Sequence, residues 1–306
     1  MKKLFAILSL SLIGAFCLSG CGVPKLSASL DKNDVKLPDC PDEKEFTKVI
    51  TYESFSKAIV YEKINKALSN AKYNIYFIGN GVQVDSIAIA SVDKNGDRIG
   101  ACKTKIKAIG NPMFGMNGDQ MTYIRGRTSY TSMSVSIYEY DPMSKSTKKG
   151  NFSAKYHMDI PASDVKGVGS FFGDVAAENP NIVNPYFFID TLKENGVISD
   201  NKTTIKTKKV DSITYYLVQF SSDYLAPLGV SENTFIIAMY NKSIYGIKLR
   251  SKYYLESDPE NYLYSGVTLM PFTGTLKDVP TSFGGYEMTI EEYFKALQDR
   301  IVEILK

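Results

Sequence analysis

The sequence predicts an α+β domain in which an antiparallel sheet packs against helices. Three observations favour this class. Between about residues 82 and 270, most of the chain consists of short stretches in which apolar and polar residues alternate, as in strands with one buried face. Most neighbouring stretches have no helical segment between them, although a parallel sheet would require one. Apolar residues recur at helical spacing in residues 51–73 and 289–305, at the two ends of this region.

The first 20 residues are predicted to form an export signal. Lys2 and Lys3 precede an apolar run, residues 4–18, which is too short to cross a bilayer core of about 30 Å. The motif Leu18-Ser19-Gly20-Cys21 resembles the lipobox of bacterial lipoproteins. This resemblance implies cleavage before Cys21, a diacylglyceryl thioether on its sulfur and often an acylated new amino terminus. The mature chain would then be held on the extracytoplasmic face of a membrane, the outer one if the host has one.

Composition divides the mature chain into two parts and excludes one class of partner. Residues 21–50 are polar and interrupted by three prolines, as in a flexible tether, and no linker divides residues 51–306, which predicts one domain. Loss of Lys2 and Lys3 with the signal, residues 1–20, leaves 34 of the 36 basic residues against 33 acidic ones. A nucleic-acid-binding protein needs a strongly basic patch, so this near-neutral charge argues against nucleic acid as a partner.

The first strands are predicted from a hairpin. Gln83–Val92 and Arg98–Ala108 flank Asn95-Gly96, a pair that favours two-residue hairpin turns. In the second stretch every other residue is a lysine, which predicts one solvent face and one buried face. These solvent-facing residues are Lys103, Lys105 and Lys107. Further strands are predicted at residues 132–137, 151–158, 203–210, 212–220, 233–240, 243–253 and 262–270.

Two apolar segments, Val165–Ala177 and Pro185–Gly196, interrupt the strands. The second is predicted to be a helix, with proline at its first position and glycine after its end. It is apolar nearly all round and therefore needs cover on most sides. The chain closes with an amphipathic helix, in which Thr289 and Glu292 form a capping box and the apolar stripe includes Phe294.

Two cysteines remain after Cys17 leaves with the signal and Cys21 takes the lipid. Cys40 and Cys102 are an even pair in an exported protein, and disulfides persist in oxidising compartments. The sequence leaves two alternatives. Either a disulfide pins the tether to the sheet, or the two are separate thiols, one of them buried.

No motif for catalysis, metal binding or a cofactor is found. His157 is the single histidine and lies among polar residues of its strand, which predicts a solvated side chain without the partners that a triad or metal cluster needs. Residues 93–97 begin like a calcium loop but lack its terminal glutamate and lie between strands. We therefore expect no cofactor and no metal.

The order of the predicted elements (helix, strands, apolar helical insertion, more strands) resembles the outer-membrane lipoprotein carrier superfamily and its mycobacterial lipoprotein relatives. The resemblance spans roughly residues 51–275, and the C-terminal helix departs from it. It implies a strongly curved sheet, or half-barrel, with helices packed into its concave face around a cavity for acyl chains. The implied ligand-binding residues are Phe171, Phe172, Phe187 and Phe188 on the insertion and Phe152, Tyr156 and Tyr216 on the sheet.

These observations favour a membrane-anchored lipoprotein that binds a lipid or another apolar ligand and is not an enzyme. The same aromatic residues could instead form a filled core, which would make the chain a structural or surface-interaction lipoprotein. A third alternative is an exported hydrolase that uses carboxylates such as Asp85 or Asp97, and clustered carboxylates with raised pKa values would favour it.

Overall fold

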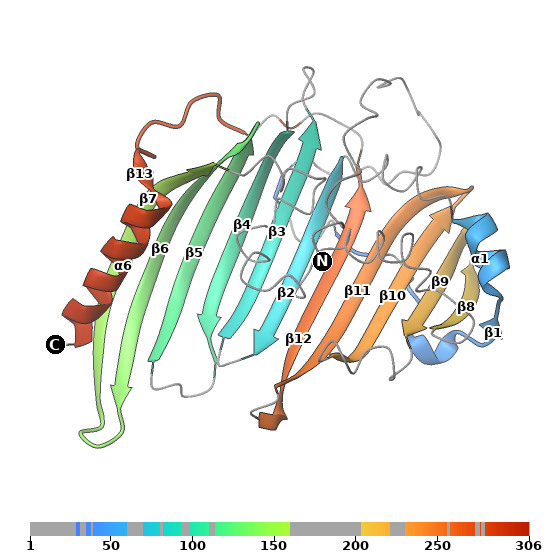
Figure 1. Ribbon diagram of the computed structural model, residues 1–306. Coiled ribbons are helices and arrows are strands. Elements are labelled where there is room, and N and C mark those ends of the chain that lie inside the picture. Colours follow the sequence, from blue (N-terminus) through green and yellow to red (C-terminus); the bar gives the residue numbers. More distant parts are fainter. Residues whose placement is uncertain are drawn as a thin grey trace, which may run out of the picture.

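The structure, a computed structural model, contains one sheet of thirteen strands (Figure 1). It describes residues 29–30, 35–37, 39–59, 70–79, 82–92, 98–109, 114–159, 203–220, 230–255, 258–272, 276 and 279–305. The predicted signal with Cys21 lies outside these residues, as do Asp97 and the whole apolar insertion with Phe171, Phe172, Phe187 and Phe188.

The sheet consists of two antiparallel meanders that pair with each other. The first contains β2 (Ala71–Gly79), β3 (Val82–Val92), β4 (Arg98–Ala108), β5 (Phe114–Arg125), β6 (Thr128–Asp141) and β7 (Ser146–Asp159). The second contains β8 (Thr203–Val210), β9 (Ile213–Phe220), β10 (Val230–Tyr240), β11 (Ser243–Leu255) and β12 (Asp258–Pro271), and β12 pairs with β2. The sheet is open: β1 (Lys48–Val49) pairs with β8 at one edge and β13 (Met288–Thr289) with β7 at the other. The predicted antiparallel sheet is therefore confirmed.

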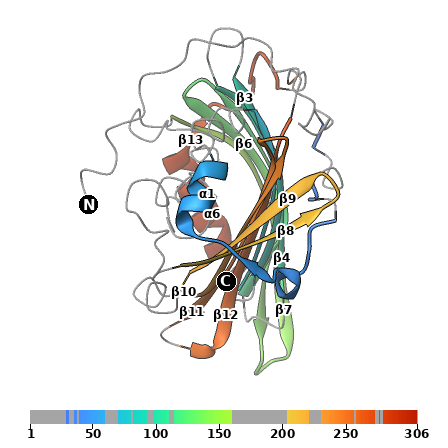
Figure 2. The same ribbon diagram turned by 90° about the vertical axis from the view of Figure 1, so that its right-hand side faces the viewer.

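Figure 2 shows that the sheet is curved and that the two α-helices of the described residues, α1 (Tyr52–Ala58) and α6 (Ile290–Leu305), lie on its concave side. The alternation in β4 decides which side chains face which way. Lys103, Lys105 and Lys107 are exposed on the convex face, as predicted, whereas Cys102 and Thr104 are buried on the concave face.

Helix α1 is shorter than the helix predicted over residues 51–73. The Thr51 hydroxyl accepts a hydrogen bond from the Ser54 amide and caps its first turn. Residues 71–73, however, begin β2, and Tyr73 is completely buried between neighbouring strands. The prediction was wrong there because the period changes from helical spacing to alternation of Tyr73, Ile75 and Phe77, which suits a strand.

Helix α6 confirms the predicted capping box. The Thr289 amide donates to Glu292 Oε2 at 2.8 Å, and the Glu292 amide donates to Thr289 Oγ1 at 3.2 Å. The helix packs on β7, where a side chain at Gly150 would come within 2.5 Å of Ile304. Glycine therefore allows the close approach. Phe294, in contrast to its predicted place in the buried stripe, is 53% exposed.

The convex face is crossed by two non-regular segments. The N-terminal strap, residues 35–46 without the undescribed residue 38, buries Val35, Leu37 and Phe46 against β9 and β10. The C-terminal strap, residues 279–289, packs its Phe283 ring flat on Tyr130 with ring centroids 3.8 Å apart. The flexible tether predicted through residue 50 is therefore too long, because residues 35–46 contribute to the core.

Salt bridges also link the N-terminal strap to the sheet through a short 3-10 helix, η2 (Glu43–Glu45). Glu43 pairs with Arg250 and Glu45 with Lys208, both at 2.5 Å. The hydrogen bond from Lys208 lowers the pKa of the Glu45 carboxyl. Exposed pairs of this kind contribute about 0–1 kcal/mol each, so apolar burial dominates the docking of the strap.

Phe46→Ala tests whether the strap belongs to the domain. Because Phe46 is only 2% exposed, we expect the free energy of unfolding to fall by about 3–5 kcal/mol in denaturant titrations. Val49→Ala is the matched control, since Val49 is 64% exposed, and should cost less than about 0.5 kcal/mol. Equal, small losses in both variants would restore the prediction of a flexible tether.

Candidate functional site

The aromatic residues predicted to line a cavity lie on one face of the sheet but at its two ends. Phe152 and Tyr156 of β7 are buried under α6, where the Tyr156 ring stacks on Tyr293 with centroids 4.3 Å apart. Tyr216 of β9 contacts Phe55 of α1, with an edge-on ring geometry and centroids 5.7 Å apart. The structure does not bring the three sheet residues together. Helix α6 covers Phe152 and Tyr156, a role that the sequence did not predict for it.

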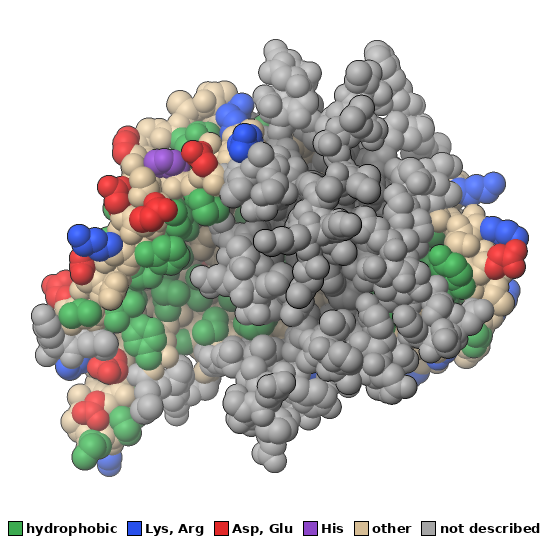
Figure 3. All heavy atoms as spheres, viewed as in Figure 1, with side chains coloured by type: hydrophobic (Ala, Val, Ile, Leu, Met, Phe, Trp, Pro, Cys, Tyr) green, Lys and Arg blue, Asp and Glu red, His purple; other side chains and the backbone are tan. Residues whose placement is uncertain are grey.

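Beside α6, part of the concave face carries apolar side chains at the surface. Figure 3 shows a band of hydrophobic side chains beside the charged outer side of α6. Near this helix, Ile106 and Met116 are only partly buried against the cluster that α6 forms with β6 and β7. Phe114 of β5 is 46% exposed and Phe294 of α6 is 53% exposed. Two large apolar rings are therefore available for contact with a ligand.

Hydroxyl groups interrupt the apolar concave face across its central strands. Ser86 of β3 and Thr104 of β4 lie 2.8 Å apart, oxygen to oxygen, and Thr122 of β5 and Thr131 of β6 lie 3.0 Å apart. All four residues are buried. The two hydroxyls of each pair form a hydrogen bond with each other. These polar groups therefore lie in the core without a large desolvation cost.

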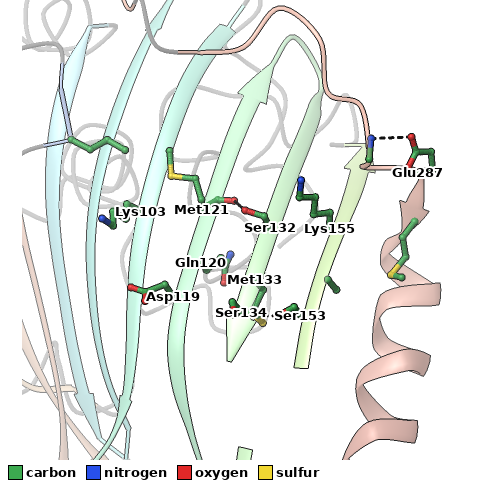
Figure 4. Close-up of a pocket in the computed structure, with 14 residues that line it drawn as sticks. Lys103, Asp119, Gln120, Met121, Ser132, Met133, Ser134, Ser153, Lys155 and Glu287 are labelled. Atoms are coloured by element: carbon green, nitrogen blue, oxygen red, sulfur yellow. Dashed lines mark hydrogen bonds between the residues drawn. The ribbon is translucent and has the colours of Figure 1, made fainter. Parts of the chain in front are cut away.

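A groove of about 1090 Å³ lies on the opposite, convex face, between the two straps (Figure 4). Leu30 lines it near the N-terminal strap, and residues 285–288 of the C-terminal strap line it at the other end. Its floor is formed by β4 to β7. The outward-pointing residues of these strands in the groove are Lys103, Asp119, Met121, Ser132, Ser134, Ser153 and Lys155.

The charges of the groove are held in place by the C-terminal strap. The Glu287 carboxylate accepts the Gly285 amide at 3.0 Å, and this hydrogen bond lowers the pKa of Glu287, with a smaller contribution from Lys155. Lys155 Nζ lies 5.4 Å from the centre of the Tyr286 ring, within the range of a cation–π contact. No local pattern in the sequence indicates this groove, because the straps that enclose it cannot be located from such patterns.

The sequence predicted a solvated side chain for His157, and this prediction was wrong. Its Nδ1 forms a 2.8 Å hydrogen bond with the Tyr286 carbonyl, and the side chain is half-buried beneath the C-terminal strap. In the described part of the chain, no three His, Cys, Asp or Glu residues gather as they would around a metal ion.

The described carboxyl groups whose pKa is clearly shifted do not favour the alternative of a hydrolase, which would need raised pKa values. Asp85 accepts a 2.9 Å hydrogen bond from the Gln83 amide and lies opposite Lys105 in the sheet. Where the structure clearly shifts the pKa of a described carboxyl, the pKa is lowered, as it is in Asp141 by the hydroxyl of Ser144. Lowered pKa values favour the anion and not a general acid.

Cys40 and Cys102 are not joined in a disulfide, and both remain thiols in this structure. Cys102 is buried on the concave face, whereas Cys40 lies beside the N-terminal strap cluster on the convex face. The sheet itself separates the two sulfur atoms.

No described helix is long and apolar enough to span a membrane.

Comparisons with known proteins do not place the chain in a family. No protein-family model matches it, and no curated protein sequence does so either. Among solved structures, an S-type phycobiliprotein lyase from Guillardia theta matches 74% of this chain and 100% of its own, with 6% sequence identity. The TM-score of 0.17 is too low for this likeness to bear on fold or function.

The two thiols should react differently with a thiol reagent. Burial raises the pKa of Cys40, so its thiolate fraction and its labelling rate should continue to rise at pH values where an exposed thiol has reached its plateau. Cys102 should react only when the protein unfolds, because it is buried. Mass spectrometry of the labelled, non-reduced chain measures both rates. A chain from its native compartment that gains neither label after unfolding would contradict the free-thiol structure.

Proposed function

We propose that the protein is a lipid-anchored lipoprotein on the extracytoplasmic face of a bacterial membrane that binds a lipid or another apolar ligand without catalysing a reaction. The single observation that carries the binding part is the band of apolar side chains beside α6 on the concave face (Figure 3), together with the half-exposed rings of Phe114 in β5 and Phe294 in α6. Exposed apolar surface of this kind marks ligand or partner sites. We also propose that the curved sheet is a half-barrel like that of the lipoprotein carrier superfamily.

The anchor is supported by the lipobox and by the position of the N-terminal strap. From Cys21 to the strap at Val35 the chain has 14 residues, which span at most roughly 50 Å when extended. The strap runs along the convex face.

The concave face suits the hydrocarbon part of a lipid. Its apolar residues offer contacts to an acyl chain, whose burial contributes about 0.8 kcal/mol per CH₂. The hydroxyl pairs Ser86–Thr104 and Thr122–Thr131 are buried and bonded within each pair, so the apolar side chains carry the proposed contact with a ligand.

The alternative of a structural lipoprotein with a filled core is favoured by one observation. Phe152 and Tyr156 pack against α6 and Tyr216 against α1, so helices of the chain itself contact these rings. If the protein binds an apolar ligand, the half-exposed rings of Phe114 and Phe294 contact it. If the protein is a structural lipoprotein, these rings contact no ligand.

Cys21→Ser tests the anchor. Stable attachment to a membrane takes two acyl chains, and the variant has no thiol to carry the diacylglyceryl group. We expect an unlipidated precursor that the lipoprotein peptidase does not cleave. In mass spectrometry its polypeptide should still contain residues 1–20. Processing of the variant to the mature, lipid-modified mass would contradict the lipobox assignment.

A fluorescent fatty acid tests the ligand. We expect saturable binding to the mature chain carrying Cys21→Ser, and a loss of affinity of about fivefold in Phe294→Ser, because part of one phenyl ring no longer contacts the ligand. Val302→Ser is the control, since Val302 is also exposed on α6, at 44%. Absence of binding, together with normal stability of the chain, would favour the structural lipoprotein.

A further inference from the structure

The convex groove is a separate site, on the opposite face of the sheet from the apolar region. It occupies the part of β4 to β7 that lies between the two straps. Its shape therefore depends on tertiary packing at both ends, from Leu30 on one side and from Gly285 to Met288 on the other.

The strand register sets the spacing of its charges. Lys103 lies opposite Met121, Met121 opposite Ser132, and Ser132 opposite Lys155. These four residues form one row across four neighbouring strands. Strands lie about 4.8 Å apart, so the backbones at Lys103 and Lys155 are separated by roughly 14 Å.

Each end of this row also carries a carboxylate. Asp119 lines the groove from the strand next to that of Lys103, two residues before Met121 (Figure 4). Glu287 lies near Lys155 and is kept anionic by the Gly285 amide. A polyanion would meet Asp119 and Glu287, and a polycation would meet the two lysines, so neither suits the groove.

The middle of the groove combines an apolar patch with hydroxyl groups. Met121 and Leu30 supply apolar surface. Ser153 Oγ donates to Ser134 Oγ at 3.1 Å, which leaves the Ser134 hydroxyl hydrogen free to rotate toward a ligand carbonyl. A neutral sugar would pair with none of the charged groups at the two ends, whereas a ligand with charge at both ends can pair with one of them at each end.

We propose that this groove binds a short, extended peptide of four to five residues with an apolar centre and free termini. About four extended residues span roughly 14 Å. The α-carboxylate pairs with the lysine at one end and the α-ammonium with the carboxylate at the other, while main-chain groups reach the serine hydroxyls. Because this site is on the convex face, the proposal does not depend on lipid binding by the concave face.

The test is calorimetric titration of the mature chain carrying Cys21→Ser with the pentapeptide Ala-Ala-Leu-Ala-Ala. We expect the free-ended peptide to bind about tenfold or more tightly than its N-acetylated, C-amidated form, because two charge-assisted contacts are lost on blocking. In the double variant Lys103→Gln/Lys155→Gln this preference should fall to about threefold, because neither end then offers a cation for the α-carboxylate and only the contact of the α-ammonium with Asp119 or Glu287 remains.

Lys107→Gln is the matched control, because Lys107 is exposed on the same face of β4 but does not line the groove. This variant should keep the full preference for the free-ended peptide, and oleate should not displace the peptide. Equal affinity of the two peptides for the unmodified groove, no binding at millimolar peptide, or the same loss in Lys107→Gln would overturn the proposal. A negative result here would leave fatty-acid binding by the concave face unaffected.

Discussion

The rest of the structure depends on the pairing of β2 with β12. Residues 71–78 form an antiparallel ladder with residues 264–271, nearly two hundred positions later in the chain. This ladder joins two meanders, each built from local hairpins, into one sheet with two continuous faces. Tyr73 and Leu269 lie opposite each other in the ladder, and both are completely inaccessible to solvent. The joint is therefore stabilised by burial as well as by backbone hydrogen bonds.

A sheet of this size exposes two edges, and the protein covers both of them. At one edge, β13 pairs with Tyr156 and His157 of β7, and farther along the same strand Arg300 Nε donates to the Asn151 carbonyl at 3.0 Å. At the other edge, the two residues of β1 pair with β8. Unpaired strand edges invite association with other chains, so these short covers favour a sheet that stays on its own.

The two faces are covered by different kinds of structure, and this difference separates their chemistry. Regular helices lie on the concave face, where their apolar residues extend the core and leave half-exposed rings beside α6. Irregular straps cross the convex face, where apolar anchors such as Phe46 and Phe283 hold them, while charged and hydroxyl side chains remain between them. One sheet thus offers an apolar surface on one side and a groove of balanced charge on the other.

The sequence by itself determined the local structure. Alternation in β4 predicted which side Lys103 faces, Asn95-Gly96 predicted the connection of β3 to β4, and the Thr289–Glu292 pair predicted the start of α6. Each of these depends on residues a few positions apart, whose interactions are the same in any tertiary context. The lipobox is a local signal of the same kind and stays a prediction.

Only the tertiary structure decided which segment covers which face. Alternation shows that a strand has two faces, but it does not show that α6 covers Tyr156, that residues 35–46 pack on the sheet, or that Cys40 and Cys102 lie on opposite sides of it. The groove likewise exists because Leu30 and Gly285 meet the same strands from distant parts of the chain. These features arise from contacts between segments far apart in sequence, and hydrophobic burial, which drives such contacts, is non-directional and carries no local signature of its partner.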